Sequence, residues 1–216
     1  MRSRLTQLAL ATAASLIVGP TLQAQVLGLP LRNSGIPSGV GISGEIGFPN
    51  TDYGKGTAFG GTGQIGLGPI GFTATIASYK PKGGGSTTGY GGTGNLKIFG
   101  GPLIPLSVTL QGGYGRAKTG GVTNSHFTAG LGIALNIPNP ALAIRPWLAP
   151  RLDVARVSGP TPTRTDNNFG ISGGVDFNLL SGLGFRASYD WVKARSNVKP
   201  AIFGLGVAYV FKVPGL

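Results

Sequence analysis

Alternation of side-chain character constrains the fold of this chain more than any other feature. In the segment 203–211, "FGLGVAYVF", large apolar residues alternate with residues that are mostly small. The same period of two recurs in nine earlier segments: 39–48, 58–67, 70–79, 92–99, 105–115, 126–135, 144–155, 169–179 and 183–191. Because successive side chains of a β-strand point to opposite faces, the pattern predicts about ten strands with one apolar face each.

Composition argues against helices and against a water-exposed surface. Gly makes up 40 of the 216 residues, whereas its typical share is about 7%. Charged residues make up only 11%, whereas about 25% is typical. Glycine disfavours helix interiors, and so few charges cover the outside of a soluble domain poorly. The joins between the segments are rich in Gly, Pro, Asn and Ser, and long joins alternate with short ones, which is typical of outer-membrane barrels.

These strands can form two kinds of barrel. A soluble, exported ligand-binding barrel would hide the apolar faces inside, whereas a membrane barrel turns them to lipid and keeps small and polar residues in a narrow lumen. The polar faces hold mainly Gly, Ser, Thr, Ala, Asn and Gln, which favours the membrane form. We predict an all-β, closed antiparallel transmembrane barrel of about ten strands. Eight is the alternative, because Pro146 and Pro150 interrupt the seventh segment.

The beginning of the chain predicts export. Residues 1–24 combine basic Arg2 and Arg4 with an apolar stretch and a small residue at Ala24, as in a cleaved signal peptide. We therefore expect a single domain, the barrel, over 25–216, in which 25–37 is an extended leader or a segment that enters the lumen. An even strand number would place both termini at the end with the short turns. The sequence contains no Cys, so disulfides do not contribute.

The signal peptide, the alternating strands over about 37–212 and the aromatic-ending "FGLGVAYVF" resemble the small bacterial outer-membrane β-barrel proteins of the opacity and porin-like group. The resemblance implies location in the outer membrane of a Gram-negative cell, and insertion by the barrel-assembly machinery, which in that group recognises an aromatic-ending last strand. Here "KVPGL" follows Phe211, where the group's pattern ends at the aromatic residue.

Charged residues fall on the predicted lumen face. The residues expected to form a charge network in the lumen are Arg145, Arg151, Asp153, Asp176, Arg186 and Asp190, with Glu45 and Lys97 on the opposite wall beside Gln64 and Gln111. A symmetric turn about Ser181 would place Asp176 opposite Arg186. Two interpretations stay open: a structural network that holds the strands together, or a constriction that selects small solutes.

Other functions have weaker support. His126 and Ser125 would suit a lipid hydrolase, but the sequence shows no defined carboxylate partner, and a histidine at the rim is favoured. We expect no enzyme activity, no cofactor and no metal site. The net charge of +12 would suit nucleic acid, but export argues against it. Cations near the outer ends suit lipid phosphates instead, or an adhesion partner. They are Lys55, Lys80, Lys82, Arg116, Lys118, Arg156, Arg164, Lys193, Arg195 and Lys199.

Overall fold

A computed structural model of the protein describes residues 26–101, 104–137, 139, 142–160, 162–194 and 198–211. The predicted signal peptide, 1–24, and Arg195 lie outside these residues. Within them the chain forms ten strands and one short 3-10 helix: β1 (Gly39–Pro49), η1 (Thr51–Tyr53), β2 (Gly56–Leu67), β3 (Ile70–Pro81), β4 (Thr87–Phe99), β5 (Leu106–Thr119), β6 (Val122–Leu135), β7 (Leu142–Ser158), β8 (Arg164–Leu179), β9 (Leu183–Lys193) and β10 (Ala201–Phe211).

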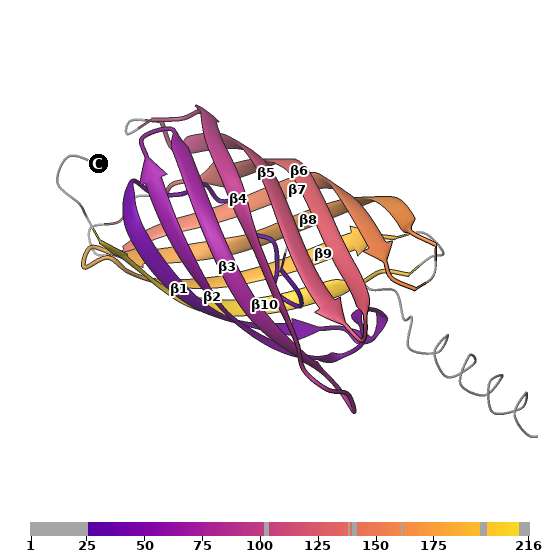
Figure 1. Ribbon diagram of the computed structural model, residues 1–216. Coiled ribbons are helices and arrows are strands. Elements are labelled where there is room, and N and C mark those ends of the chain that lie inside the picture. The colour runs from indigo at the N-terminus through magenta and orange to yellow at the C-terminus, as the bar shows by residue number, and fades with distance from the viewer. Residues whose placement is uncertain are drawn as a thin grey trace, which may run out of the picture.

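The ten strands close into one antiparallel barrel (Figure 1). Each strand pairs with its sequence neighbours, and β1 pairs with β10 from Val40↔Phe211 to Pro49↔Ile202. Closure gives every strand a partner on both sides, which is the condition for a sheet in lipid. The prediction of a ten-stranded barrel is confirmed, and the eight-stranded alternative is wrong.

The apolar faces point outward. Phe59, Ile76 and Leu152 expose about three-fifths of their surface, at 61%, 61% and 63%, whereas Ala58 and Ala149 on the opposite faces expose 0% and 1%. The residues that line the inside are mainly small or polar, as the sequence predicted. An apolar exterior needs an apolar surrounding, so the arrangement matches a membrane barrel and not the soluble alternative.

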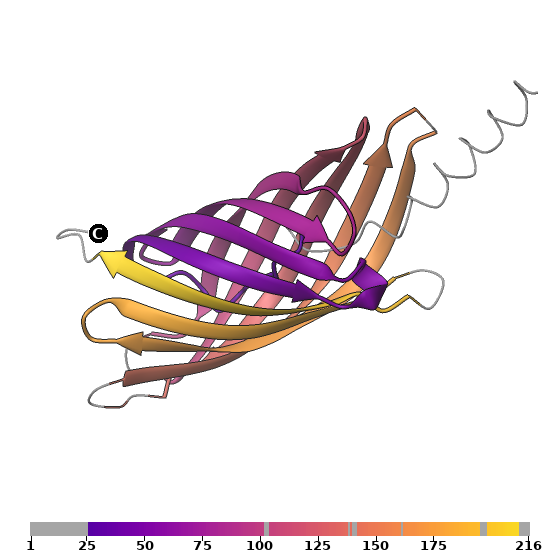
Figure 2. The same cartoon turned by 90° about the horizontal axis from the view of Figure 1, so that it is seen from below.

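We call the end where β1 begins and β10 finishes the inner end, and the opposite end, which carries η1, the outer end (Figure 2). Strands β5 to β8 are the longest, at 14, 14, 17 and 16 residues, whereas roughly 9–11 cross a bilayer. They overhang the membrane at the outer end.

The expected alternation of long and short joins is only partly correct. The outer join between β5 and β6 is a tight turn at Gly120 and Gly121, both with positive φ, as a two-residue hairpin turn requires. The inner join 100–105 is longer than the expected short turn "GGP", whereas the inner join 136–141 has the expected bounds. The protrusion between β5 and β6 therefore consists of paired strand in place of an irregular loop.

Proline disturbs β7 without ending it. Pro146 and Pro150 face outward and pair in register with Val175 and Ile171 of β8. On the other side the ladder with β6 breaks between Gly130↔Arg151 and Ile133↔Leu148. Since proline has no N–H to donate, the break beside Pro150 absorbs the missing hydrogen bond.

Residues 26–38, directly before β1, lie inside the barrel. Residues 26–38, which we call the plug, run through the lumen from the outer to the inner end. Val26 lies against Gly91 and Leu27 against Gly89 near the outer end, and Ile36 lies against Gly71 near the inner end. At roughly 3.3 Å per residue the plug can extend about 40 Å, more than the ~30 Å hydrocarbon core.

The described chain therefore starts at the outer end and enters β1 at the inner end. The expectation that both termini lie at one end holds for the end of β10 but is wrong for the start of the plug. An even strand number fixes only the ends of the barrel wall, whereas the start of the plug lies at the opposite end because the plug runs through the lumen.

Glycines on the lumen face make room for the plug. A Cβ built on Gly132 would overlap the carbonyl oxygen of Asn33, whereas a Cβ on the outward-facing Gly112 would meet nothing within 4 Å. We predict that Gly132→Ala destabilises the barrel by about 1–3 kcal/mol, because over-packing forces the plug backbone to shift. Gly112→Ala is the matched control and should leave stability unchanged or slightly raise it.

Urea unfolding of both refolded variants, followed by the heat-dependent shift on a denaturing gel, measures the difference. Equal stability of the two variants would contradict the tight fit of the plug against β6.

Candidate functional site: the charged lumen and its plug

Asp176 on β8 anchors the middle of the plug. The Arg32 guanidinium binds it in a bidentate manner, with Nε to Oδ1 at 3.2 Å and Nη2 to Oδ2 at 2.5 Å, and the Ser34 hydroxyl donates to Oδ2 at 2.7 Å. The Asp176 side chain is only 3% exposed and that of Arg32 20%. A buried carboxylate needs such a partner, so this ion pair fixes the position of the plug.

Asp190 on β9 forms a second anchor. Its Oδ1 lies 2.7 Å from Arg151 Nη2 in an ion pair and accepts a hydrogen bond from the Ser172 hydroxyl at 3.1 Å, while its Oδ2 accepts the backbone N–H of Leu31 at 3.2 Å. Both ionised side chains are almost completely buried, at 2% and 1% exposure. One carboxylate thus joins β7, β8 and β9 to the plug.

The third ion pair joins the two strands on either side of β10. Arg186 Nη1 lies 2.7 Å from Glu45 Oε1. Both residues pair in register with Gly206 of β10, and a Cβ built there would crowd both side chains. The missing side chain at Gly206 is what allows the pair to form across an intervening strand.

The outer end of the plug is held by aromatic residues. The backbone N–H of Gly28 donates to the Tyr53 hydroxyl at 2.8 Å, and the Tyr53 and Tyr79 rings pack edge to face at 5.6 Å. Tyr53 lies in η1, outside the membrane-spanning strands, and burial raises the pKa of its phenol. It therefore stays neutral and accepts the hydrogen bond at any physiological pH.

The remaining predicted residues have separate surroundings. Arg145 Nη2 donates to the Ser107 hydroxyl at 3.0 Å, and Gln111 donates both to Asn95 and to the carbonyl of Arg32. Lys97 lies on the lumen side near the inner mouth, and among the described residues it has no carboxylate within ion-pair distance.

The predicted register of the β8–β9 hairpin is confirmed, with Asp176↔Arg186 and Phe177↔Phe185. The side chains do not pair as this register suggested, because Asp176 binds Arg32 and Arg186 binds Glu45. Sequence reasoning missed Arg32 and Ser34, since neither lies in an alternating segment. The position of Arg32 between the signal and the first strand was the only available hint.

His126 is buried and has a carboxylate partner, contrary to the expectation that it lacks one. It is 6% exposed and its Nδ1 lies 3.2 Å from Asp153 Oδ1. Ser125 points to the opposite face of β6, where its hydroxyl lies 3.4 Å from that of Tyr114. Alternation of side chains along a strand separates this serine from the histidine, so the adjacent pair in the sequence is not a pair in space.

The comparisons with known proteins agree with this architecture. The profile of the family described as "Outer membrane protein beta-barrel domain" matches residues 11–211. The chain belongs to this family. Its members' location, the bacterial outer membrane, is therefore also that of this protein.

Several solved structures are similar to this chain, and the first of them supports the barrel fold. The β domain of the Bordetella autotransporter BrkA matches with a TM-score of 0.56 and 14% identity, covering 81% of this chain and 100% of that one. Neisserial surface protein A, NspA, matches at 0.41 and 13%, covering 81% and 98%. Ail of Yersinia pestis matches at 0.36 and 15%, covering 81% and 100%. Comparison with curated protein sequences gives no significant match. In the part of the chain that the structure describes, no helix is long and apolar enough to span a membrane.

The buried pair Arg32–Asp176 generates a second prediction. Arg32→Gln leaves a buried carboxylate without its cation and should lower the free energy of unfolding by about 3–5 kcal/mol. Arg164→Gln is the control, because the Arg164–Asp166 pair involves an arginine that is 66% exposed. Exposed pairs contribute only about 0–1 kcal/mol.

Urea titration of the refolded proteins compares the two substitutions. The double change Arg32→Met with Asp176→Met should recover most of the loss, since it removes both charges together. If Arg32→Gln behaved like Arg164→Gln, the anchoring role of Asp176 would be wrong.

Proposed function

We propose that the protein is a structural barrel of the outer membrane that stays closed to solutes and acts through the wall and loops of its outer end. The observation that carries this proposal is the plug. It occupies the lumen from end to end and is held by the buried Arg32–Asp176 ion pair, by the hydrogen bond from the Leu31 N–H to Asp190 and by close contacts with wall glycines. Such a segment is part of the folded core.

A small cavity lies beside the middle of the plug, and a wider recess of about 510 Å³ opens at the inner mouth beside Ser38 and Lys97. A cavity of about 60 Å³ lies between plug residues such as Leu29 and Arg32 and wall residues such as Thr75 and Gln111. Since one water needs about 10–15 Å³ of such volume, the cavity holds a few waters. A sugar or an amino acid does not fit into this cavity, which supports a closed barrel over an open pore.

A porin-like passage along the same wall is the second candidate function. The charged side chains of β7, β8 and β9 favour it, because they would line a selective channel if the plug left. If the plug left, Asp176 would lose its ion pair with Arg32, and Asp190 would lose its hydrogen bond from the Leu31 N–H. Both carboxylates are buried, so plug release carries a large energetic cost, and we place this function second.

A hydrolase is the third interpretation, and the geometry gives it less support. The His126–Asp153 pair has the form of a general base with its orienting carboxylate. It faces the lumen, however, while Ser125 faces away from it, and among the described residues no serine is hydrogen-bonded to His126. We therefore propose no acyl-transfer role for this pair.

Conductance measures the state of the lumen directly. In planar bilayers the wild type should show no stable open level, whereas a variant that lacks residues 26–36 should show stepwise conductance, because the lumen is then vacant. Gly112→Ala, which leaves the plug untouched, is the control and should stay silent. Gly132→Val, which displaces the plug without shortening the chain, tests the same point if the deletion fails to refold.

A wild type that conducts as well as the deletion variant would overturn the closed barrel and favour the porin-like role.

Release of fatty acid from outer-membrane lipid tests the third interpretation. We expect no release by the wild type, and none by His126→Ala, because no serine nucleophile lies beside the histidine. Release by the wild type that disappears in His126→Ala would restore the hydrolase.

A further inference from the structure

The charges of the barrel are divided between its two faces. The chain contains six carboxylates. Five lie on the lumen side of the strands, namely Glu45, Asp153, Asp166, Asp176 and Asp190, and the sixth, Asp52, lies in η1 and accepts the backbone N–H of Lys199. The outward face of the barrel therefore carries no carboxylate to neutralise a cation.

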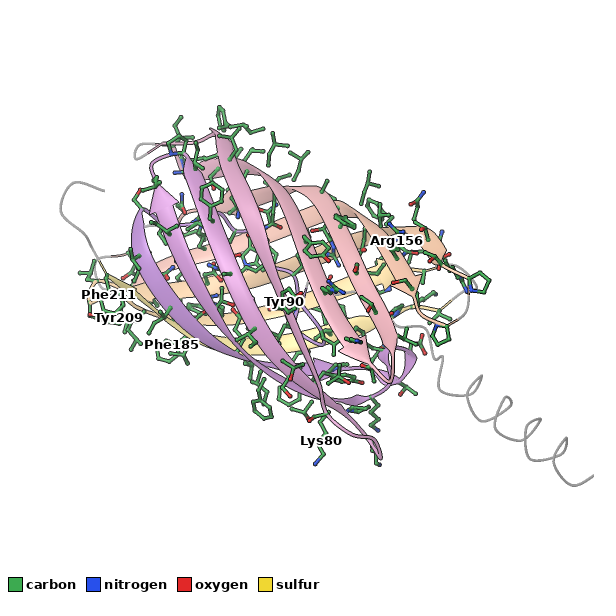
Figure 3. All side chains as sticks on the ribbon, viewed as in Figure 1. Lys80, Tyr90, Arg156, Phe185, Tyr209 and Phe211 are labelled. Carbon is green, nitrogen blue, oxygen red and sulfur yellow. The ribbon has the colours of Figure 1, made fainter. Side chains whose placement is uncertain are left out.

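Among the described residues, the cations of the outward face are confined to its outer end. They are Lys80 on β3, Arg116 and Lys118 on β5, Arg156 on β7 and Lys193 on β9, all exposed. Figure 3 shows Lys80 and Arg156 far from Phe185, Tyr209 and Phe211, which lie at the inner end. In the part of the chain that the structure describes, the cation belt lies on one side of the apolar band only, which matches a membrane whose outer leaflet is the more anionic.

Two of these cations form a defined row. Arg116 pairs in register with Ser125 of β6, Ser125 pairs with Arg156 of β7, and Arg156 pairs with Thr165 of β8. Neighbouring strands are about 4.8 Å apart, so the two arginines stand roughly 10 Å apart with the Ser125 hydroxyl between them. Their long side chains can converge on one anion above the serine.

The row lies directly beyond the outermost aromatic residues of these strands. Two residues nearer the inner end on the same strands, the rings of Tyr114 and Phe127 pack at 4.9 Å, and Val154 of β7 continues that apolar row. The Tyr114 hydroxyl points up to the Ser125 hydroxyl, at 3.4 Å. Aromatic rings mark the headgroup level of a barrel, so Arg116 and Arg156 meet the depth at which lipid phosphates lie.

We infer that Arg116, Ser125 and Arg156 form an external binding site for a phosphate group of an anionic outer-leaflet lipid. Guanidinium groups suit this ligand because their fork of N–H donors matches two phosphate oxygens, and the serine adds a neutral donor. Among the described residues neither arginine has a carboxylate partner, so both are free to bind. Lys118, one outward position further along β5, adds positive charge to the same patch.

The inference rests on the proposed function, since it names the partner of the outer wall. The inference is tested separately from conductance. A closed barrel that fails to bind lipid phosphate would contradict the inference alone, and a conducting barrel that binds it would contradict the proposed function alone. The occupant follows from charge and position together, because lipid is the permanent neighbour of this wall.

Binding of purified lipopolysaccharide to the refolded full barrel in detergent tests the site, with enzymatically dephosphorylated lipopolysaccharide as the second probe. We expect Arg116→Gln with Arg156→Gln to weaken binding at least about tenfold, because two charge-assisted contacts are lost. The control is Lys82→Gln with Lys199→Gln, which removes the same charge from exposed loop positions and should change affinity by less than about twofold. Dephosphorylated lipid should bind weakly to every variant.

Equal binding of phosphorylated lipid by both double variants would overturn the site, as would undiminished binding of the dephosphorylated form. Inorganic phosphate serves as a competitor. If it displaced the lipid completely at millimolar concentration, the row would be a general anion site and the lipid assignment would be wrong. If the double variant failed to refold, Arg116→Gln and Arg156→Gln would be compared singly, each with an expected intermediate loss.

Discussion

The width of the lumen is the constraint on which the rest of this structure depends. A sheet in lipid must close so that every backbone amide is paired, and ten strands close around a space wider than eight strands do. The inward residues are too small to fill it, because glycine and alanine alternate with the apolar exterior. The chain fills the space with its own segment 26–38, whose backbone runs against Gly132 and other wall glycines. Small inward residues and the plug are thus two parts of one packing solution.

A filled lumen explains where the carboxylates lie. Charges in a narrow, poorly hydrated interior are stable only when they are paired, and the plug supplies partners that the wall lacks. Arg32 neutralises Asp176, and the Leu31 N–H donates a hydrogen bond to Asp190. The network therefore couples the plug to three adjacent strands, and the stability of the barrel and the closure of its lumen have the same physical origin.

The outward face of the barrel has the opposite arrangement, with cations that have no carboxylate partner among the described residues. With the chain's carboxylates turned inward or held in η1, the cations of the outward face remain unneutralised, and they gather at one end, above the apolar band. The charge of the outward face thus differs between its two ends: aromatic residues lie at the inner end, and arginines beside a serine lie at the outer end. A membrane with phosphate-rich headgroups on one side provides a matching environment, and the polarity of the wall then reinforces the orientation that the strand ends define.

The sequence by itself determined the strands, their apolar faces, the closed antiparallel class and the Asp176↔Arg186 register, because a period of two is local and each hairpin fixes its own pairing. Only the tertiary structure decided that Asp176 binds Arg32, that Arg186 reaches across Gly206 to Glu45 and that His126 meets Asp153. These contacts depend on the curvature of the closed sheet and on a segment without periodicity. No local pattern in the chain records which side chains will meet across the lumen.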